Sequence, residues 1–307
     1  MQTTNNILLI RPSNFVFNPE TAVSNAFQVK VNESDDAIRK KVFAEFEAMA
    51  ATLKSKDVNV FIFDDTPQPQ KPDAIFPNNW ITFHPDGTVI LYPMCATNRR
   101  HERRPDIIDS LKKNFSVMNV KDFSKYEKEN RFLEGTGSIV FDHDNKIAYA
   151  CLSARTDKEL FIRLCEFIHY KPVYFHSYDK GGLEIYHTNV MMCIAEKFAV
   201  ICTASISDKK EREQVIQSLS STGHQIIDIT FEQMNCFAGN MLAIRTNSNK
   251  SIVALSKNAF DCLTANQKKE IGKYCELVPL SIPTIETIGG GSARCMIAEI
   301  FLKPAHQ

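Results

Sequence analysis

The sequence predicts an α/β fold in which five units, each ordered strand, strand, helix, strand, close into a ring with pseudo-fivefold symmetry. Five polar or glycine-containing segments each precede a strand-like run. Their anchor residues are spaced 55, 53, 53 and 55 residues apart: Asn79, Glu134, His187, Asn240 and Cys295. A period of this length, with similar elements after each anchor, is the sequence mark of a modular architecture.

The third unit shows the pattern in full. Residues 138–153 read as a hairpin with its turn at 142–145. Residues 156–170 begin with Thr156 or Asp157 as a helix N-cap and place apolar residues at helical spacing, and 171–177 form a short strand. The fourth unit repeats this order at 189–205, 208–221 and 224–229, and the fifth at 240–256, 264–275 and 276–281.

The remaining two units complete the ring. The second begins with the hairpin of residues 80–93, in which Pro85, Asp86 and Gly87 mark a tight turn. The first is split across the termini: the run from Cys295 to Leu302 supplies one strand, and residues 6–12, 35–55 and 58–65 supply the second strand, the helix and the last strand. We therefore expect residues 1–307 to form a single domain. The alternative is an open α/β sheet whose element lengths recur by chance.

Composition limits the partners. Lys plus Arg equals Asp plus Glu at 36 each, so no global charge favours nucleic acid or an anionic membrane. The N-terminal apolar run has four residues and no basic region before it, and no run approaches the length of a membrane helix. We expect a cytoplasmic protein whose partner is a small molecule.

The cysteines point to the same compartment. Nine of them, an odd number, lie mostly in apolar runs without a C-x-x-C pair. This pattern predicts reduced thiols rather than disulfides or a zinc site, and no metal ligands are expected.

Four motifs occur in a fixed order along the whole chain: "FPNNW", "EGTGS", "YHTN" and "GGGSARCM". As a set they resemble the guanidine-modifying superfamily of pentein fold, and within it the arginine deiminase-related group known as citrulline utilization hydrolases. The resemblance implies an α/β propeller, no cofactor, and a homodimer as a family-level expectation.

The resemblance implies three catalytic residues. Cys295 is the candidate nucleophile, since Gly289 to Gly291 let the backbone approach a ligand; the alternative is one more buried apolar thiol. His187 is the candidate general acid and base; the alternative is a core histidine whose hydrogen bonds are satisfied. Glu134 matches the carboxylate that holds guanidino nitrogens in related enzymes; the alternative is a solvated surface group.

Other residues are candidates for substrate binding. Asn78 and Asn79 stand where arginine deiminases place an aspartate against the guanidinium, and Asn189 stands where the family has another aspartate. An amide can donate to a neutral ureido oxygen, so these changes favour a citrulline-like or modified substrate. The alternative for the first pair is a simple turn before Trp80.

Three arginines and one more amide complete the candidates. The run "NRRHERR" (98–104) fits either a solvated loop or a nucleic-acid contact, but it resembles a family loop whose arginine pairs with the substrate carboxylate, here Arg99 or Arg100. Arg294 lies beside the thiol and would favour its thiolate form or bind substrate. Asn240 would line the pocket or cap a strand.

These residues predict a hydrolase in which a thiol attacks the guanidino or ureido carbon of an arginine- or citrulline-like amino acid and forms a covalent intermediate. If an amine resolves that intermediate, the protein is an amidinotransferase. The third alternative is a catalytically silent binding module. The glycines of "GGGSARC" lack the spacing and the following helix of a phosphate-binding loop.

Overall fold

The computed structural model describes residues 1–305, in which the strands form five separate three-stranded sheets. In ring order, the sheets are β15 (Ala298–Glu299), β1 (Asn6–Arg11) and β2 (Asn59–Asp64); β3 (Ile81–Phe83), β4 (Thr88–Leu91) and β5 (Asn119–Asp122); β6 (Val140–Asp142), β7 (Ile147–Cys151) and β8 (Lys171–Phe175); β9 (Met192–Ile194), β10 (Phe198–Ile201) and β11 (Gln225–Asp228); β12 (Leu242–Arg245), β13 (Ser251–Ser256) and β14 (Glu276–Leu280).

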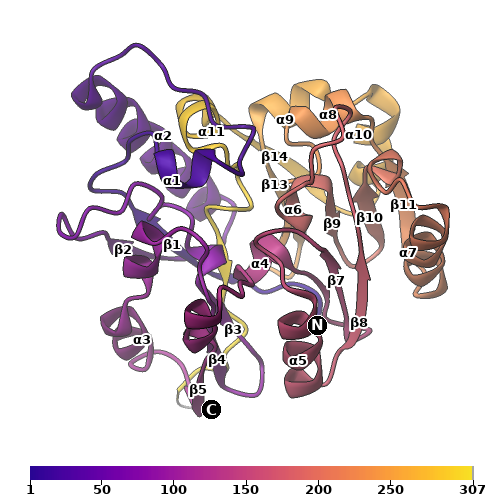
Figure 1. Ribbon diagram of the computed structural model, residues 1–307, viewed down its shortest axis with the longest axis horizontal. Coiled ribbons are helices and arrows are strands. Elements are labelled where there is room, and N and C mark those ends of the chain that lie inside the picture. The colour runs from indigo at the N-terminus through magenta and orange to yellow at the C-terminus, as the bar shows by residue number, and fades with distance from the viewer. Residues whose placement is uncertain (306–307) are drawn as a thin grey trace.

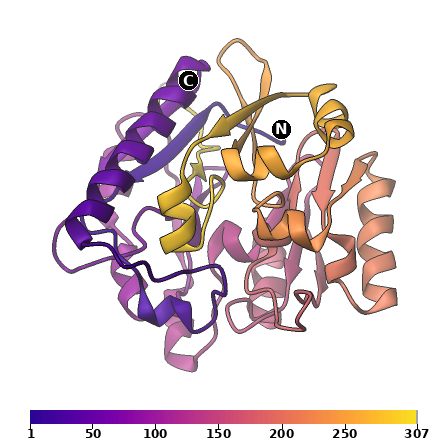
Figure 2. The same ribbon diagram turned by 90° about the horizontal axis from the view of Figure 1, so that it is seen from above.

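Helices connect and cover these sheets. The α-helices are α1 (Pro19–Ala22), α2 (Asp35–Ser55), α3 (Pro105–Leu111), α4 (Gly135–Ser138), α5 (Lys158–Ile168), α6 (Thr188–Met191), α7 (Lys209–Ser221), α8 (Phe231–Asn235), α9 (Lys257–Cys262), α10 (Ala265–Gly272) and α11 (Pro283–Gly289). The 3₁₀ helices are η1 (Pro77–Asn79), η2 (Asn98–Glu102), η3 (Ser124–Glu129) and η4 (Thr203–Ser205). Viewed from above, α2 in indigo and α7 in salmon lie on opposite outer sides of the molecule, with strands between them (Figures 1 and 2).

Every sheet has the predicted order of strands. The first and second strands pair antiparallel, as in β6 and β7 with Val140 opposite Tyr149. The second and third pair parallel, as in β7 and β8 with Ile147 opposite Lys171. A parallel pair needs a crossover, which the helix provides, so each unit is a ββαβ module.

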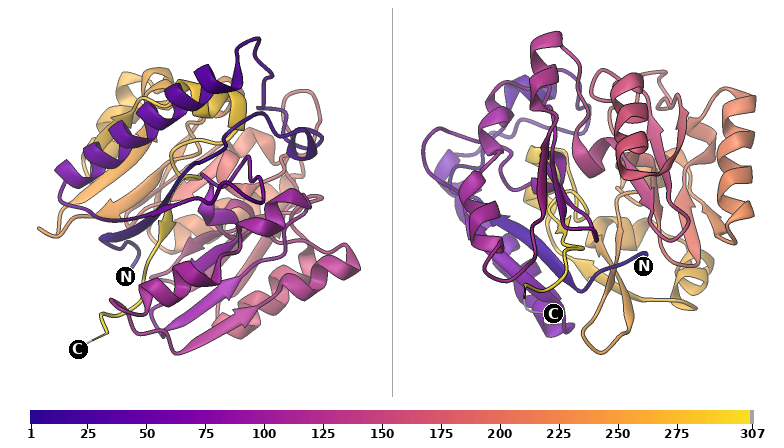
Figure 3. Two further views of the ribbon diagram at one scale, coloured as in Figure 1. Left: turned by 90° about the vertical axis from the view of Figure 1, so that its left-hand side faces the viewer. Right: turned by 90° about the horizontal axis from the view of Figure 1, so that it is seen from below.

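The first module contains strands from both ends of the chain. Strand β15 pairs antiparallel with β1, with Glu299 opposite Ile7, and β1 pairs parallel with β2. Strand β15, in yellow, and strand β1, in indigo, therefore lie side by side in one sheet (Figure 3).

Close contacts join each module to the next. Phe83 bridges Ile300 between the second and first modules, and Thr188 Oγ1 donates to the carbonyl of Ser138, at 2.5 Å, between the fourth and third. The backbone of Asn78 approaches Gly135 so closely that a Cβ on this glycine would lie under 3.0 Å from it.

The remaining two junctions lie at Asn240. Its amide donates to the carbonyl of Asn189 at 3.0 Å, which joins the fifth module to the fourth, and to Sγ of Cys295 at 3.3 Å, which joins it to the first. The ring is thus continuous, as the sequence period predicted.

The outer helices bind the ring through apolar faces. Helix α2 begins at Ser34, whose hydroxyl accepts from the amide of Ala37, and its buried residues recur at helical spacing: Ile38, Val42, Phe46, Met49, Ala50 and Leu53. None of the helices within residues 1–305 is both long and apolar enough to cross a membrane.

One prediction about the cysteines is wrong. The structure joins Cys236, at the end of α8, to Cys262, the last residue of α9, in a disulfide, while seven other cysteines are free. The two thiols are 26 residues apart within the fifth module. No sequence motif marks them, because only the packing of α8 against α9 brings them together.

Candidate active site

The five anchor residues lie at the inner ends of the modules, each in or beside a short helical turn. Glu134 and His187 precede α4 and α6, and Asn79 ends η1. Asn240 and Cys295 end turns in which their amides donate three residues back, to the carbonyls of Phe237 and Ser292. All five anchors are buried. Each turn changes the direction of the backbone before the strand begins, so the anchor side chains point toward the ring axis.

Glu134 and His187 form a hydrogen-bonded pair. His187 Nε2 lies 2.8 Å from Glu134 Oε2, and the other carboxylate oxygen accepts from the backbone amide of Cys95 at 2.9 Å. The guanidinium of Arg155 lies 3.6 Å from the same Oε2. Three donors or charges therefore compensate a carboxylate that is fully buried.

This environment fixes the protonation of the pair. Burial alone would raise the pKa of Glu134, but Arg155 and the hydrogen bond from His187 hold it at about 2. Burial lowers the pKa of His187 to about 4, against the attraction of Glu134. The imidazole is thus neutral near pH 7, and because an ionised carboxylate only accepts, Nε2 carries the proton and Nδ1 has a free lone pair.

Cys295 is held by two amides. Asn240 Nδ2 lies 3.3 Å and Asn189 Nδ2 3.6 Å from Sγ. Burial raises the pKa of the Cys295 thiol, while the bonds from Ser292 N and Asn240 and the charge of Arg294 act in the opposite direction. The resting residue is therefore a thiol, with donors in place to stabilise a thiolate when the proton leaves.

Gly137 allows the site to close around His187. A Cβ on this glycine would lie 2.7 Å from both Nδ1 and Cε1 of His187 and would also collide with the amide nitrogen of Asn79. A side chain at this position would displace the imidazole, so the glycine is required by close approach and not by its backbone angle.

Asn79 is oriented by Arg99. The Arg99 guanidinium donates to Asn79 Oδ1 at 2.7 Å and forms two 2.8 Å hydrogen bonds to the carboxylate of Glu102. A guanidinium only donates, so the oxygen of Asn79 faces Arg99 and its Nδ2, buried without a partner among the described residues, remains free to donate.

Two functional candidates, Asp73 and Arg155, were not predicted from the sequence. Asp73 lines the same cavity as Cys295, with Oδ2 accepting from Asn18 and Thr21 and Oδ1 unpartnered within residues 1–305. Arg155 was missed as well. Neither residue lies in the repeated motifs; a buried aspartate in "KPDAIF" and an arginine between strand and helix in "SARTD" give no periodic signal.

A segment from the first module covers the site. Residues 18–28, named here the cover segment, bind Arg155 through the carbonyl of Thr21 at 2.8 Å and the hydroxyl of Ser24 at 2.6 Å. Asn25 Nδ2 donates to the carbonyl of Gly290 at 3.1 Å. The cavity beneath is only about 20 Å³, which is room for about one water. An amino acid does not fit this cavity, and Thr21 and Asn25 of the cover segment form part of its lining, so movement of the segment would enlarge it.

The cavity brings together several of the predicted residues and leaves others out. Its lining includes Asn79, Arg99, His187, Cys295 and the three glycines 289–291. Asn240 and Asn189 reach it through Sγ, and Glu134 through His187.

Three of the predicted substrate-binding residues do not line it. Arg100 donates to the carbonyls of Met94 and Cys95. Asn78 is buried with both amide atoms unpartnered in the described chain, and Arg294 lines a separate cavity of about 10 Å³ with Glu299. Arg294 and Cys295 are neighbours in the sequence, but their side chains line different cavities.

Among residues 1–305, no group of three His, Cys, Asp or Glu side chains is placed to hold a metal ion. What the cavity offers chemically is a thiol, a neutral imidazole backed by a carboxylate, and donors and acceptors for a polar group. A thiol and base so arranged can attack a planar carbon and return a proton to a departing nitrogen.

This fold and site define the class of the protein as a pentein of the guanidine-modifying superfamily. The chain matches the model of the eukaryotic N,N-dimethylarginine dimethylhydrolase family over residues 11–302, and it belongs to that family. No curated protein matches the sequence significantly.

Solved structures share the fold at low identity. An arginine dihydrolase from the ornithine–ammonia cycle in cyanobacteria, ArgZ, superposes with a TM-score of 0.74 at 15% identity, covering 96% of this chain and 40% of that chain. The chain thus spans about 40% of the length of that enzyme. The substrate-bound N-terminal domain of ArgZ gives 0.73 at 15%, with 97% and 99% covered. A dimethylarginine dimethylaminohydrolase variant, as an adduct with S-methyl-L-thiocitrulline, gives 0.63 at 15%, with 98% and 100% covered.

Proposed function

We propose that the protein is a cysteine-dependent hydrolase acting on the guanidino or ureido group of an arginine- or citrulline-like amino acid through a covalent thiol intermediate. The observation that carries this proposal is the meeting of Cys295 with the hydrogen-bonded His187–Glu134 pair at one buried cavity. Membership of the N,N-dimethylarginine dimethylhydrolase family supports the same chemistry.

In the first half-reaction, Cys295 gives its proton to Nδ1 of neutral His187 and Sγ attacks the central carbon of the substrate group. Asn240 and Asn189 stabilise the thiolate, and Glu134 stabilises the imidazolium. His187 then passes the proton to the departing nitrogen, which leaves as ammonia or an amine.

In the second half-reaction, water attacks the thiol-bound carbon. His187 takes the proton from that water, and Sγ leaves and is reprotonated by the imidazolium. Membership of a hydrolase family supports water, rather than a second amine, as the group that resolves the intermediate.

The polar groups of the cavity indicate which class of substrate it can bind. Asn79 Nδ2 is a free donor because Arg99 occupies its oxygen, and a donor suits the oxygen of a ureido group better than a guanidinium nitrogen. Asp73 Oδ1 is a free acceptor for a substrate N–H. We therefore propose a ureido substrate such as citrulline, with the guanidino group of arginine as the close alternative.

The test is a mass-spectrometric turnover screen of the full chain against arginine, citrulline, agmatine, methylated arginines and N-acylated arginine or citrulline. We expect citrulline to be converted to ornithine by the wild type and not by Cys295→Ala. A wild type that cannot be distinguished from Cys295→Ala across the panel would overturn the proposal.

Asn79→Asp tests the substrate assignment with a change that preserves shape. The carboxylate cannot donate to a ureido oxygen, so kcat/KM for citrulline should fall about tenfold to a hundredfold, while any turnover of arginine falls less. Asn119→Asp, on the exposed strand β5, is the matched control and should leave both unchanged. An unchanged ratio between the two substrates in Asn79→Asp would contradict the assignment.

We further propose that the chain works in the cytoplasm as a single domain, binds a small-molecule substrate and no nucleic acid or membrane, and pairs as a homodimer. The seven free cysteines support the cytoplasmic location. The equal numbers of basic and acidic residues support a small-molecule partner rather than nucleic acid or a membrane. The order of the five modules around one ring supports a single domain.

A further inference from the structure

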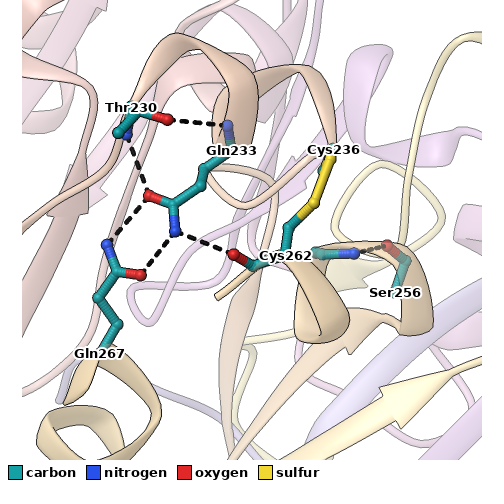
Figure 4. Close-up of a disulfide and its surroundings, with 7 residues drawn as sticks. Thr230, Gln233, Cys236, Ser256, Cys262 and Gln267 are labelled. Carbon is teal, nitrogen blue, oxygen red and sulfur yellow. Dashed lines mark hydrogen bonds between the residues drawn. A yellow bond between two sulfur atoms is a disulfide. The ribbon is translucent and has the colours of Figure 1, made fainter. Parts of the chain in front are cut away.

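The disulfide between Cys236 and Cys262 lies beside the turn that carries Asn240, the residue whose amide contacts Sγ of Cys295. It joins the end of α8 to the end of α9, with a Cα–Cα distance of 6.5 Å, and both residues are half-buried (Figure 4). Asn235, next to Cys236, is exposed and lines a groove of about 660 Å³.

Cys236 stands four residues before Asn240, and the turn between them positions the side-chain amide of Asn240. Phe237 takes a left-handed conformation with φ of 62°, and the amide of Asn240 donates back to its carbonyl at 2.8 Å. A Cβ on Gly239 would collide with the carbonyl of Val190, so this turn lies directly on the module that carries Asn189. The position of Asn240 at Sγ thus depends on where α8 ends.

Besides the disulfide, apolar packing and the hydrogen bonds of Gln233 hold α8 to α9 and α10. Gln233 Nε2 donates to the carbonyl of Cys262 at 3.0 Å and to Gln267 at 2.7 Å (Figure 4). These hydrogen bonds survive reduction, so α8 would remain docked but its last turn would lose its covalent restraint.

The same turn also contacts the cover segment. The rings of Phe237 and Phe27 pack with centroids 5.2 Å apart, and Phe27 in turn packs against Tyr186, the residue before His187. The cover segment is therefore also held by Tyr186 and Arg155, and a shift at Cys236 acts on the site first through the Asn240 amide at Sγ.

We propose that Cys236 and Cys262 form a thiol–disulfide switch that sets the reactivity of Cys295, with a low-molecular-weight disulfide such as oxidised glutathione as its oxidant. One thiolate attacks the oxidant and releases one reduced thiol; the other attacks the mixed disulfide and releases a second. Two protein thiols are oxidised, one small disulfide is reduced to two thiols, and no other reactant is needed. The inference rests on the proposed role of Cys295 as nucleophile.

The expected effect follows from the hydrogen bond to Sγ. With the disulfide formed, Asn240 is held in place and stabilises the Cys295 thiolate. Reduction loosens the turn and weakens this bond, so Cys295 should react with an electrophile roughly 3- to 10-fold more slowly at neutral pH.

The experiment equilibrates the full chain in glutathione buffers of graded reduced-to-oxidised ratio. Each sample is treated briefly with limiting iodoacetamide and quenched in acid. Peptide mass spectrometry then counts the Cys236–Cys262 bond, the alkylated fraction of Cys295 and any glutathione on Cys295. Because no substrate is involved, the result does not depend on which molecule the enzyme hydrolyses.

Three variants make the result decisive. Cys236→Ser and Cys262→Ser should alkylate Cys295 at the reduced rate in every buffer, and Cys275→Ala, which removes a free buried cysteine, should follow the wild type. Urea unfolding of each variant checks that it is folded, and the double variant Cys236→Ala/Cys262→Ala repeats the test without a new hydroxyl.

In the wild type, the fall in the Cys295 alkylation rate and the loss of the disulfide should share one midpoint. The proposal is overturned if the bond does not form or break across the buffers, or if Cys295 reacts equally fast in both states. Normal alkylation behaviour with no turnover of any substrate would instead sink the proposed function and leave the switch standing.

Discussion

Glu134 and His187, 53 residues apart in the chain, are joined by a hydrogen bond of 2.8 Å that is buried at the centre of the ring. Burial keeps the imidazole neutral near pH 7 against the attraction of Glu134, and the hydrogen bond places its proton on Nε2, so Nδ1 is available to take a proton. The thiol that needs this base, Cys295, contacts amides rather than a charged group. Charge separation in the site is therefore expected only when substrate arrives.

The first prediction concerns the pH dependence of Cys295. Burial raises the pKa of the thiol and lowers that of His187 to about 4, so no thiolate–imidazolium pair exists in the free enzyme at neutral pH. The rate of iodoacetamide alkylation should increase with pH without a plateau between pH 5 and about 8.5, the ordinary Cys pKa. Asn240→Ala should move the profile to higher pH, since it removes a donor to the thiolate. A plateau at low pH in the wild type would show a preformed ion pair instead.

The second prediction concerns Gly137. Replacing it by alanine would place a methyl group within 2.7 Å of the His187 ring, so the imidazole must shift away from the substrate carbon. We expect kcat/KM to fall by about a hundredfold, since small misplacements of a base have that effect.

Gly272, at the end of α10, is the matched control because nothing lies within 4 Å of a Cβ there. Gly272→Ala should keep full activity and stabilise the fold by about 0.5 kcal/mol. Equal activities for the two alanine variants would show that His187 tolerates the added methyl.

The regular anchors explain what the sequence could predict. Because Glu134, His187 and Cys295 each begin a repeated unit, the closed ring and the convergence of these side chains followed from spacing alone. Asp73 and Arg155 lie in connections that differ from module to module, so only the folded chain places them at the cavity.

Arg294 shows a different limit of prediction. It is adjacent to Cys295 in sequence, but the turn directs the two side chains to different cavities. Proximity in sequence therefore predicted the charge of Arg294 near the thiol, but it could not predict which cavity the arginine side chain would enter.

The third prediction concerns the buried pair formed by Arg294 and Glu299, with Nη1 and Oε2 3.9 Å apart. Burial raises the pKa of Glu299 to about 7, against the attraction of Arg294. The folded state then binds more protons than the unfolded state between about pH 4.5 and 7, so this group costs stability as the pH rises through that window.

Glu299→Gln removes this titration. The free energy of unfolding of the variant, relative to the wild type, should therefore increase from pH 5 to pH 8 by a few kcal/mol. The comparison cancels any constant effect of leaving Arg294 without its carboxylate. Urea unfolding at both pH values measures it, and a difference that is the same at pH 5 and 8 would contradict the assignment.

The last prediction concerns the cover segment. Asn25 holds it closed through its bond to the carbonyl of Gly290, a residue with φ of 61° at the end of α11. Asn25→Ala should favour the open state, because one buried hydrogen bond contributes about 1 kcal/mol to closure. Alkylation of Cys295 should then be about fivefold faster in the variant, since the probe, like the substrate, must pass this segment.

Asn119→Ala, on exposed β5 and far along the chain from the site, controls for the loss of an amide and should alkylate like the wild type. If the cover segment already opened faster than the probe reacts and stood mostly open, the rate for Asn25→Ala would not change. The cavity of about 20 Å³ argues against that state, because no amino acid fits until the segment moves. We therefore expect opening to precede substrate binding, and the loss of the Asn25 side chain to change the rate of access without altering the chemistry at Sγ.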